Sequence, residues 1–322
     1  MNPPALPRIL RPGDAIGLCA PSGFITRAQA LEQATRYLND RGYELVVSPH
    51  IHDRWEYFSG PDEDRATDLM ELSRHKRARM IMMARGGYGL TRLLPHLDFE
   101  ALAESRKIFV GFSDVTVLHL ALLAQVGYVS FAGPMACPDF GHDNPSDWHP
   151  DHFEGLLQAS SHLSPPIPFG AGDHVPALQS AARRGMEGVL WGGNLSLVAH
   201  LTGTPYMPSI PGGLLFLEEV NEEPYHVERM LMQLFHAGLL RDQQAILLGS
   251  FRGCEPTARS ASPYPMSRVV EHLRQRTRLP VFEHLPFGHV REKITLPVGG
   301  LGRIGLVDET HYQIMFSGYN AP

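Results

Sequence analysis

Residues 107–116 read Lys107-Ile108-Phe109-Val110-Gly111-Phe112-Ser113-Asp114-Val115-Thr116. The apolar run stops at a glycine and a second apolar, helix-like segment follows, so the stretch predicts a strand, a sharp turn and a helix. Such a turn lies at the carboxyl edge of a sheet, and the first N–H groups of the helix point at whatever the turn presents. Ser113 stands at this turn and is our candidate nucleophile.

Two interpretations of Ser113 stay open on the local sequence. A Ser-Asp pair after a strand is also a common helix N-cap. The nucleophile turn of many hydrolases has the pattern Gly-x-Ser-x-Gly, of which this chain has Gly111 but Val115 in place of the second glycine. The local pattern therefore does not distinguish a nucleophile from a cap.

Strand-like and helix-like segments alternate before this stretch. Strands are expected at 15–20, 43–47 and 80–84, and Thr26 with Gln29 has the pattern of a capping box that opens the first helix. This alternation predicts α/β architecture, with a parallel sheet covered on both faces.

The later part of the chain predicts a second α/β unit. Residues 136–184 are rich in Pro, Gly, His and Asp and are interpreted as a linker, which divides the chain into domains at 1–135 and 185–322. The second unit is expected to contain strands at 188–191, 213–219 and 245–251, helices at 195–201, 225–237 and 267–277, and a hairpin of 303–307 with 312–316.

Composition narrows the class of protein. The chain has 322 residues, 28 basic against 34 acidic side chains and no basic stripe, which argues against a nucleic-acid partner. No apolar run approaches the roughly 18 residues of a membrane span. Three widely spaced cysteines, Cys19, Cys137 and Cys254, and no secretory signal indicate the cytoplasm. No H-E-x-x-H or C-x-x-C occurs, so we expect no metal and no cofactor.

A second strand end carries candidate chemistry. Arg85-Gly86-Gly87-Tyr88-Gly89 follows the strand at 80–84, and consecutive glycines let backbone N–H groups approach an anion. The same residues are equally consistent with a tight turn. Neither nucleotide-binding glycine pattern is present.

A serine nucleophile needs an imidazole to take its proton and an acid to orient that imidazole. Glu218 and Glu219 end an apolar run, and His289 follows Phe287-Gly288. The order serine, acid, histidine is compatible with a triad but is not diagnostic, because unrelated folds use different orders. From the residues alone, the chain is a plausible serine hydrolase.

Six segments, in this order, resemble the LD-carboxypeptidase (muramoyltetrapeptide carboxypeptidase) family. They are Ala20-Pro21-Ser22-Gly23, Arg85-Gly86-Gly87-Tyr88-Gly89, Gly111-Phe112-Ser113-Asp114-Val115-Thr116, Gly192-Gly193-Asn194-Leu195-Ser196, Leu215-Phe216-Leu217-Glu218-Glu219 and Phe287-Gly288-His289. The resemblance runs from about residue 15 to about residue 300. It implies a flavodoxin-like parallel-sheet N-terminal domain that holds the serine and a smaller α/β C-terminal domain that holds the glutamate and histidine.

The resemblance also implies roles for individual residues. Ser113 would be the nucleophile, His289 the general base and Glu218 the acid that orients it. Glu218 is favoured over Glu219 because the family places the acid first after the apolar run, and successive strand residues face opposite ways. The chain departs from the family at Val290, where a glycine commonly follows the histidine.

The oxyanion donors implied by the resemblance are the backbone N–H of Asp114 and that of Gly86 or Gly87. A carboxypeptidase must also hold a free carboxylate, for which Arg85 is a candidate. Asn194 and Trp191 are further candidates for the substrate cleft, although Trp191 ends an apolar run, which favours a place in the core.

The family's activity implies the substrate, which is the terminal D-alanine of the murein tetrapeptide, removed across an L,D bond during cytoplasmic cell-wall recycling. It also suggests a homodimer. Two alternatives stay open: a microcin-immunity-type peptidase that cleaves a peptidyl-nucleotide, and a non-catalytic sensor of cell-wall peptides.

Overall fold

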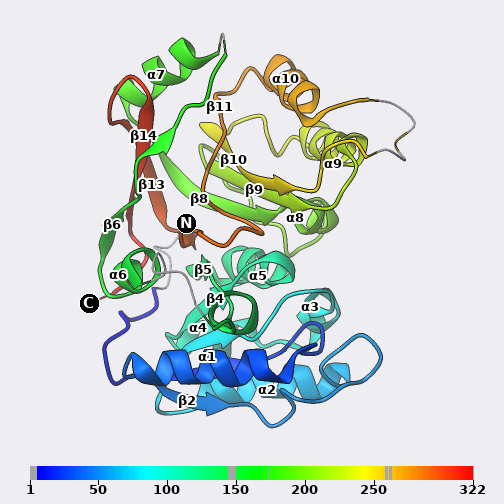
Figure 1. Ribbon diagram of the computed structural model, residues 1–322, viewed down its shortest axis with the longest axis vertical. Coiled ribbons are helices and arrows are strands. Elements are labelled where there is room, and N and C mark those ends of the chain that lie inside the picture. Colours follow the sequence, from blue (N-terminus) through cyan, green and yellow to red (C-terminus); the bar gives the residue numbers. More distant parts are fainter. Residues whose placement is uncertain (1–5, 144–149, 173, 258–259, 261–262, 322) are drawn as a thin grey trace.

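A computed structural model describes residues 6–143, 150–172, 174–257, 260 and 263–321. Within these residues the chain forms two sheets, which Figure 1 shows one below the other with helices around each. The expected α/β class is confirmed. In the described parts, every helix falls short of the length and apolar character needed to cross a membrane.

The first sheet contains, in spatial order, β2 (Glu44–Val47), β1 (Ala15–Cys19), β3 (Ala78–Met83), β4 (Ile108–Gly111), β5 (Ser130–Ala132) and β12 (Leu296–Val298). All neighbouring strands from β2 to β5 run parallel. The order 2-1-3-4-5 is that of a flavodoxin-like sheet, so the expectation for the N-terminal half is confirmed.

Helices cover this sheet because its strands are apolar on both faces. They are α1 (Ala28–Asp40), α2 (Asp62–Arg74), α3 (Leu90–Leu93), α4 (Phe99–Glu104) and α5 (Thr116–Val126). The capping box expected at Thr26 is wrong: Arg27 occupies the N-cap position of α1, and no side chain caps that end. Thr26 lies one residue before the cap, where its hydroxyl does not bond to the helix.

The second sheet contains, in spatial order, β11 (Val281–Phe282), β10 (Ala245–Arg252), β9 (Leu214–Val220), β8 (Met186–Asn194), β13 (Leu301–Leu306), β14 (His311–Ser317) and β6 (Ser161–Leu163). Strands β8 to β11 are parallel, and β13 and β14 form the expected hairpin. The helices of this half are α7 (Val175–Arg184), α8 (Leu195–Leu201), α9 (Pro224–His236) and α10 (Met266–Thr277).

Two features cross the expected division into 1–135, 136–184 and 185–322. The described part of the linker region contains α6 (Gly155–Leu157) as well as β6 and β7 (Ile167–Pro168), both of which pair with β14. Both strands are short and lie at a sheet margin, where the missing N–H of Pro168 in β7 is tolerated. In addition, β12 pairs antiparallel with β5 of the first sheet. The domain limits therefore stay a prediction.

The two halves meet where the first residues of α5 face the end of β8. The backbone N–H of Asn194 donates to Thr116 Oγ1 at 3.0 Å. A Cβ at Gly193 would lie 2.4 Å from the same oxygen, and its φ of 140° also favours glycine. The nucleophile turn of the first sheet is thereby brought against the second sheet, with α5 and α8 beside each other in Figure 1.

Candidate active site

Ser113 lies on the tight turn between β4 and α5 with a φ of 62°. This left-handed backbone is strained for a residue with a side chain and is typical of the nucleophile turn of hydrolases. A helix N-cap typically has an extended backbone instead, and Phe112, with a φ of −144°, has this conformation at the N-cap of the short helix formed by residues 113–115. The structure therefore favours the nucleophile interpretation of Ser113 over the cap.

The glycine loop after β3 passes directly beside this serine. A Cβ at Gly86 would lie 3.1 Å from Ser113 Cβ and 3.2 Å from Ser113 Oγ. Asp114 N lies 3.6 Å from the same point. Gly86 is therefore required for the close approach, and the backbones of residues 86 and 114 border the serine hydroxyl.

The carboxylate of Asp114 ties three strand-end loops together. It is fully buried, and its Oδ2 accepts hydrogen bonds from Ser22 Oγ at 2.6 Å and from Leu90 N at 2.9 Å. Burial raises the pKa of this carboxyl, while the two hydrogen bonds oppose the rise. Ser22 follows β1 and Leu90 follows the glycine loop, so Asp114 fixes both against the turn that carries the serine.

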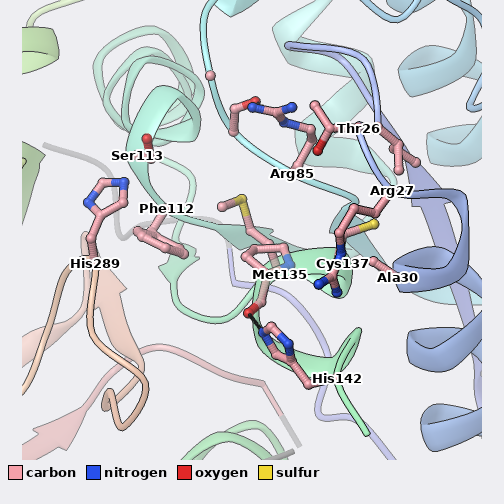
Figure 2. A pocket seen from close by; sticks show the side chains of 14 residues that line it. Thr26, Arg27, Ala30, Arg85, Phe112, Ser113, Met135, Cys137, His142 and His289 are labelled. Carbon is pink, nitrogen blue, oxygen red and sulfur yellow. Dashed lines mark hydrogen bonds between the residues drawn. The ribbon is translucent and has the colours of Figure 1, made fainter.

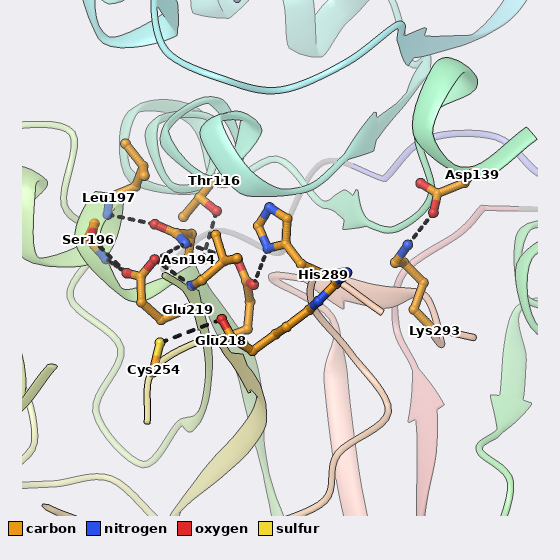
Figure 3. A network of polar contacts seen from close by, with 12 residues as sticks. Thr116, Asp139, Asn194, Ser196, Leu197, Glu218, Glu219, Cys254, His289 and Lys293 are labelled. Atoms are coloured by element: carbon orange, nitrogen blue, oxygen red, sulfur yellow. Dashed lines mark hydrogen bonds and ion pairs between the residues drawn. The ribbon is translucent and has the colours of Figure 1, made fainter. Parts of the chain in front are cut away.

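His289 and Glu218 form the other side of the site (Figure 3). His289 Nδ1 donates to Glu218 Oε2 at 2.8 Å, and the glutamate is fully buried at the end of β9. Gly288 allows this approach: its φ is 116°, and a Cβ there would lie 2.9 Å from Glu218 Oε2. The bond to Nδ1 leaves Nε2 of the imidazole free to take a proton.

Glu219 faces away from the imidazole. Its Oε2 accepts from the backbone N–H and the hydroxyl of Ser196, at 2.8 and 2.6 Å. Successive strand residues face opposite sides, so only Glu218 reaches the histidine. Asn194 Nδ2 donates to both acids, at 3.1 Å to Glu218 and 3.0 Å to Glu219.

Ser113 and His289 line one cavity of about 360 Å³, which also contacts Arg85, Gly86 and Gly87. Figure 2 shows Ser113 and His289 next to each other on one side of this cavity. Of the hydrogen bonds among the described residues, none joins these two side chains. In serine hydrolases this bond commonly tightens only when substrate is bound.

The opposite wall of the cavity holds residues that the sequence analysis missed. Thr26, Arg27 and His142 line it, and Arg27 Nη2 donates to Gly141 O at 2.8 Å. Thr26 and Arg27 could have been expected here from the sequence, because they follow β1 and so lie at the same sheet edge as the serine. None of the described residues lining the cavity is acidic, and two are arginines.

The three candidate substrate residues lie in different environments. Arg85 lines the cavity, with Nη1 donating to Phe24 O at 2.7 Å and Nε to Gly86 O at 3.0 Å. Asn194 is buried, and its side-chain amide donates hydrogen bonds to Glu218 and Glu219. Trp191 is buried in the core, where its Nε1 donates to Gln243 Oε1 at 2.9 Å. Neither Asn194 nor Trp191 lines the cavity.

Potential metal ligands gather away from this cavity. Among the described residues, His50, Asp53 and Asp64 each have a ligand atom within 4.8 Å of the others. All three are partly or fully exposed, and His50 Nδ1 is hydrogen-bonded to Asp68 Oδ1 at 2.8 Å. This exposed charge cluster does not contribute to the site of Ser113.

Both halves of the chain match known domains. Residues 16–133 match the LD-carboxypeptidase N-terminal domain, and residues 187–304 match the LD-carboxypeptidase C-terminal domain. The chain belongs to the LD-carboxypeptidase family. It is thus a serine-type peptidase, and the resemblance stated from its motifs is confirmed.

Relatives of this LD-carboxypeptidase cover nearly its whole length. It is 32% identical to a probable murein peptide carboxypeptidase of Bacillus subtilis, over 94% of this chain and 92% of the relative. It superposes on the crystal structure of a muramoyltetrapeptide carboxypeptidase from Oxalobacter formigenes with a TM-score of 0.85 and 37% identity, covering 95% and 100% of the two chains. The structure of the microcin C7 self-immunity protein MccF in complex with aspartyl sulfamoyl adenosine also superposes with a TM-score of 0.85. The two sequences are 25% identical, and the match covers 98% of this chain and 100% of MccF.

Proposed function

We propose that this LD-carboxypeptidase removes the terminal D-alanine from the murein tetrapeptide, across an L,D bond, in cell-wall recycling. The observation that carries the proposal is the shared cavity of Ser113 and a His289 whose Nδ1 is held by buried Glu218. The relatives named as murein peptide and muramoyltetrapeptide carboxypeptidases support the choice of substrate.

In the proposed reaction, Ser113 Oγ attacks the carbonyl carbon that precedes the terminal D-alanine. Its proton passes to His289 Nε2, the nitrogen that Glu218 leaves free. The imidazolium then protonates the leaving amine, and D-alanine departs. A water molecule, deprotonated by His289, hydrolyses the acyl-enzyme and restores the serine. Glu218 stabilises the imidazolium in both steps.

Backbone donors would stabilise the oxyanion of each tetrahedral intermediate. The N–H groups of Asp114 and of Gly86 or Gly87 belong to the two loops that border Ser113 Oγ. Such preorganised donors are each worth roughly 10²- to 10³-fold in kcat. The side chain of Asp114 accepts hydrogen bonds from Leu90 N, which follows the glycine loop, and from Ser22 Oγ, which follows β1. Asp114 thereby holds both of these segments against the turn that carries Ser113.

The charge of the cavity suits an anionic peptide. Arg85 and Arg27 contact it and no acidic side chain among the described residues does, whereas the peptide ends in a carboxylate. Arg85 is adjacent to the oxyanion loop and so is our candidate for the carboxylate next to the scissile bond. Arg27 would meet a carboxylate further along the peptide.

The test is mass spectrometry of murein tetrapeptide incubated with the purified protein, beside a control tetrapeptide that ends in L-alanine. We expect loss of one alanine from the first peptide and no change in the second. Cleavage of both would contradict the L,D specificity. Cleavage of neither would overturn the proposed activity.

A microcin-immunity-type activity is the second candidate, because MccF shares the fold over almost the whole chain. Aspartyl sulfamoyl adenosine therefore forms a third arm of the same assay. Its hydrolysis without that of the tetrapeptide would favour the second candidate. Calorimetric binding of tetrapeptide without turnover would favour the sensor instead.

The homodimer and the cytoplasmic location stay predictions from the family resemblance. Light scattering that gives the mass of a single chain would contradict the dimer. A metal-free mechanism predicts full activity after treatment with EDTA, and zinc-dependent recovery of a lost activity would contradict it.

A further inference from the structure

A buried ion pair lies behind the nucleophile turn. Lys293 Nζ bonds to Asp139 Oδ1, and the two side chains are only 2% and 3% exposed. Asp139 Oδ2 accepts from Met135 N at 2.7 Å, which fixes the acid to the segment that lines the cavity at Met135 and Cys137. Figure 3 shows the pair beside His289, with Lys293 and His289 on the same loop.

The ammonium of Lys293 also packs on the aromatic neighbour of the nucleophile. Its Nζ lies 4.6 Å from the centroid of the Phe112 ring. The same ring makes an edge contact with His289, at 5.1 Å between centroids and 66° between planes. The cation contacts the ring and the ring contacts the imidazole, and Figure 2 shows Phe112 and His289 beside Ser113.

The backbone closes this loop at its base. Ile294 N donates to Pro286 O at 2.8 Å, so residues 286–294 form a closed loop that carries His289. Arg291 and Glu292 at its tip are exposed, whereas Lys293 is buried. The side chain of Lys293 therefore attaches this loop to Asp139, in addition to the bond that His289 makes to Glu218.

Stability alone does not account for such a pair. The free energy needed to desolvate two buried charges is about as large as the free energy gained from their attraction. Replacing such a pair with apolar side chains is therefore often neutral or stabilising. A fixed cation under an aromatic ring, by contrast, defines where that ring lies. The position of the ring in turn limits where the imidazole can lie.

We propose that the Asp139–Lys293 ion pair is a positioning device, which acts through Phe112 to hold His289 Nε2 toward Ser113 Oγ. This inference rests on the proposed roles of Ser113 and His289. Lys293 itself touches neither the substrate nor the reacting atoms. Its effect is on the alignment of the base, and misalignment of about 1 Å costs on the order of 10²-fold in rate.

The test separates positioning from stability with a neutral double variant. Lys293→Met alone leaves Asp139 buried and uncompensated, so it is expected to lose both stability and rate. Adding Asp139→Asn removes the second charge and keeps an oxygen for the N–H of Met135. We expect the double variant to regain the wild-type Tm while its kcat stays roughly 10- to 100-fold low, with KM within about threefold.

Two further variants test the contacts of Phe112 with Lys293 and with His289. Lys293→Arg keeps the cation and should recover most of the kcat. Phe112→Leu keeps both charges of the ion pair but removes the ring between Lys293 and His289, and it should lower kcat in the same way as the double variant. Arg183→Met is the matched control, since Arg183 pairs with Glu309 on the surface with both side chains more than half exposed. This control should leave kcat and KM unchanged.

A double variant with wild-type kcat, or a Phe112→Leu variant with wild-type kcat, would overturn the proposal. Failure of the wild type to cleave any of the three substrates would instead contradict the proposed function. In that case the readout is the low-field proton signal of His289 Nδ1–H, which the bond to Glu218 produces. The proposal expects this signal to shift or broaden in the double variant, and an unchanged signal would overturn it.

Discussion

Ser113 has a backbone conformation that few residues with a side chain adopt. Its φ is 62°, and Gly86 passes close enough that a Cβ there would contact its side chain. The sequence indicated the turn through Gly111 but could not exclude a helix cap, because the value of φ at Ser113 could not be predicted from it. The left-handed φ favours the nucleophile interpretation.

His119 is the residue for which the structure predicts a dependence on pH. It is buried in α5, with Nε2 donating to Gly111 O at 2.9 Å and Nδ1 accepting from Ser130 Oγ at 2.9 Å. Burial lowers the pKa of this imidazole to about 4, against a small opposing effect of its bond to Gly111. Both ring nitrogens are satisfied in the neutral form, and a proton on Nδ1 would require the hydroxyl of Ser130 to change from donor to acceptor.

The direction in which folding stability changes with pH follows from the number of protons that each state binds at His119. Between about pH 6.5 and about pH 4 the unfolded chain binds a proton at His119 and the folded chain does not, so stability falls as the pH falls through this window. The loss at about pH 5 is roughly 2 kcal/mol. We expect His119→Asn to be less stable than the wild type at neutral pH but to lose less on acidification. Urea unfolding at about pH 7 and about pH 5 measures the stability of each protein and its loss on acidification. Equal losses of stability in the wild type and in His119→Asn would contradict the prediction.

At the scale of elements, the start of α8 and the end of β9 form one unit. Asn194 caps α8 by accepting from Leu197 N at 3.3 Å and, with its amide nitrogen, donates to Glu218 and Glu219. The amide therefore lets two buried acids lie beside each other.

Asn194→Asp keeps a cap on α8 but replaces the donor with a third carboxylate. Repulsion between the carboxylates should weaken the bond of Glu218 to the imidazole, so we expect kcat to fall roughly 10²- to 10⁴-fold. Asp98→Asn is the matched control, because Asp98 caps α4 by accepting from Ala101 N. Steady-state kinetics of both variants checks this, and a wild-type kcat for Asn194→Asp would contradict it.

Elements with continuous apolar runs were predictable, and irregular ones were not. The expected helix at 195–201 coincides with α8, and the strand at 245–251 is one residue short of β10. The strands β6 and β7 were missed because two or three residues beside prolines carry no periodicity; their pairing with β14 defines them. The pattern at Thr26 predicted a cap, yet α1 begins after Arg27, and both residues line the cavity.

At the scale of the molecule, the two sheets are linked by groups far apart in the chain. Strand β12 completes the first sheet, the Asp139–Lys293 pair joins two loops, and Asn194 N bonds to Thr116. We therefore expect both sheets to unfold together. Hydrogen exchange during a urea titration should give one midpoint for residues 108–122 and residues 214–231, and two separate midpoints would contradict this.

These long-range links also explain what the sequence could reveal about the site. The serine, the acid and the histidine were assigned through motifs that match a family, and the order of the segments made that match specific. Asp139 and Lys293 belong to no such motif, and only folding brings the two side chains together. Their proposed role could therefore be inferred only from the structure.

The most direct test of the central claim is the hydrolysis of murein tetrapeptide by Ser113→Ala, measured as released D-alanine against the wild type. We expect a fall in kcat of at least about 10³-fold with an unchanged Tm, because the hydroxyl makes no hydrogen bond to another side chain or to the backbone among the described residues. A variant that folds and retains a rate within about tenfold of the wild type would show that Ser113 is not the nucleophile.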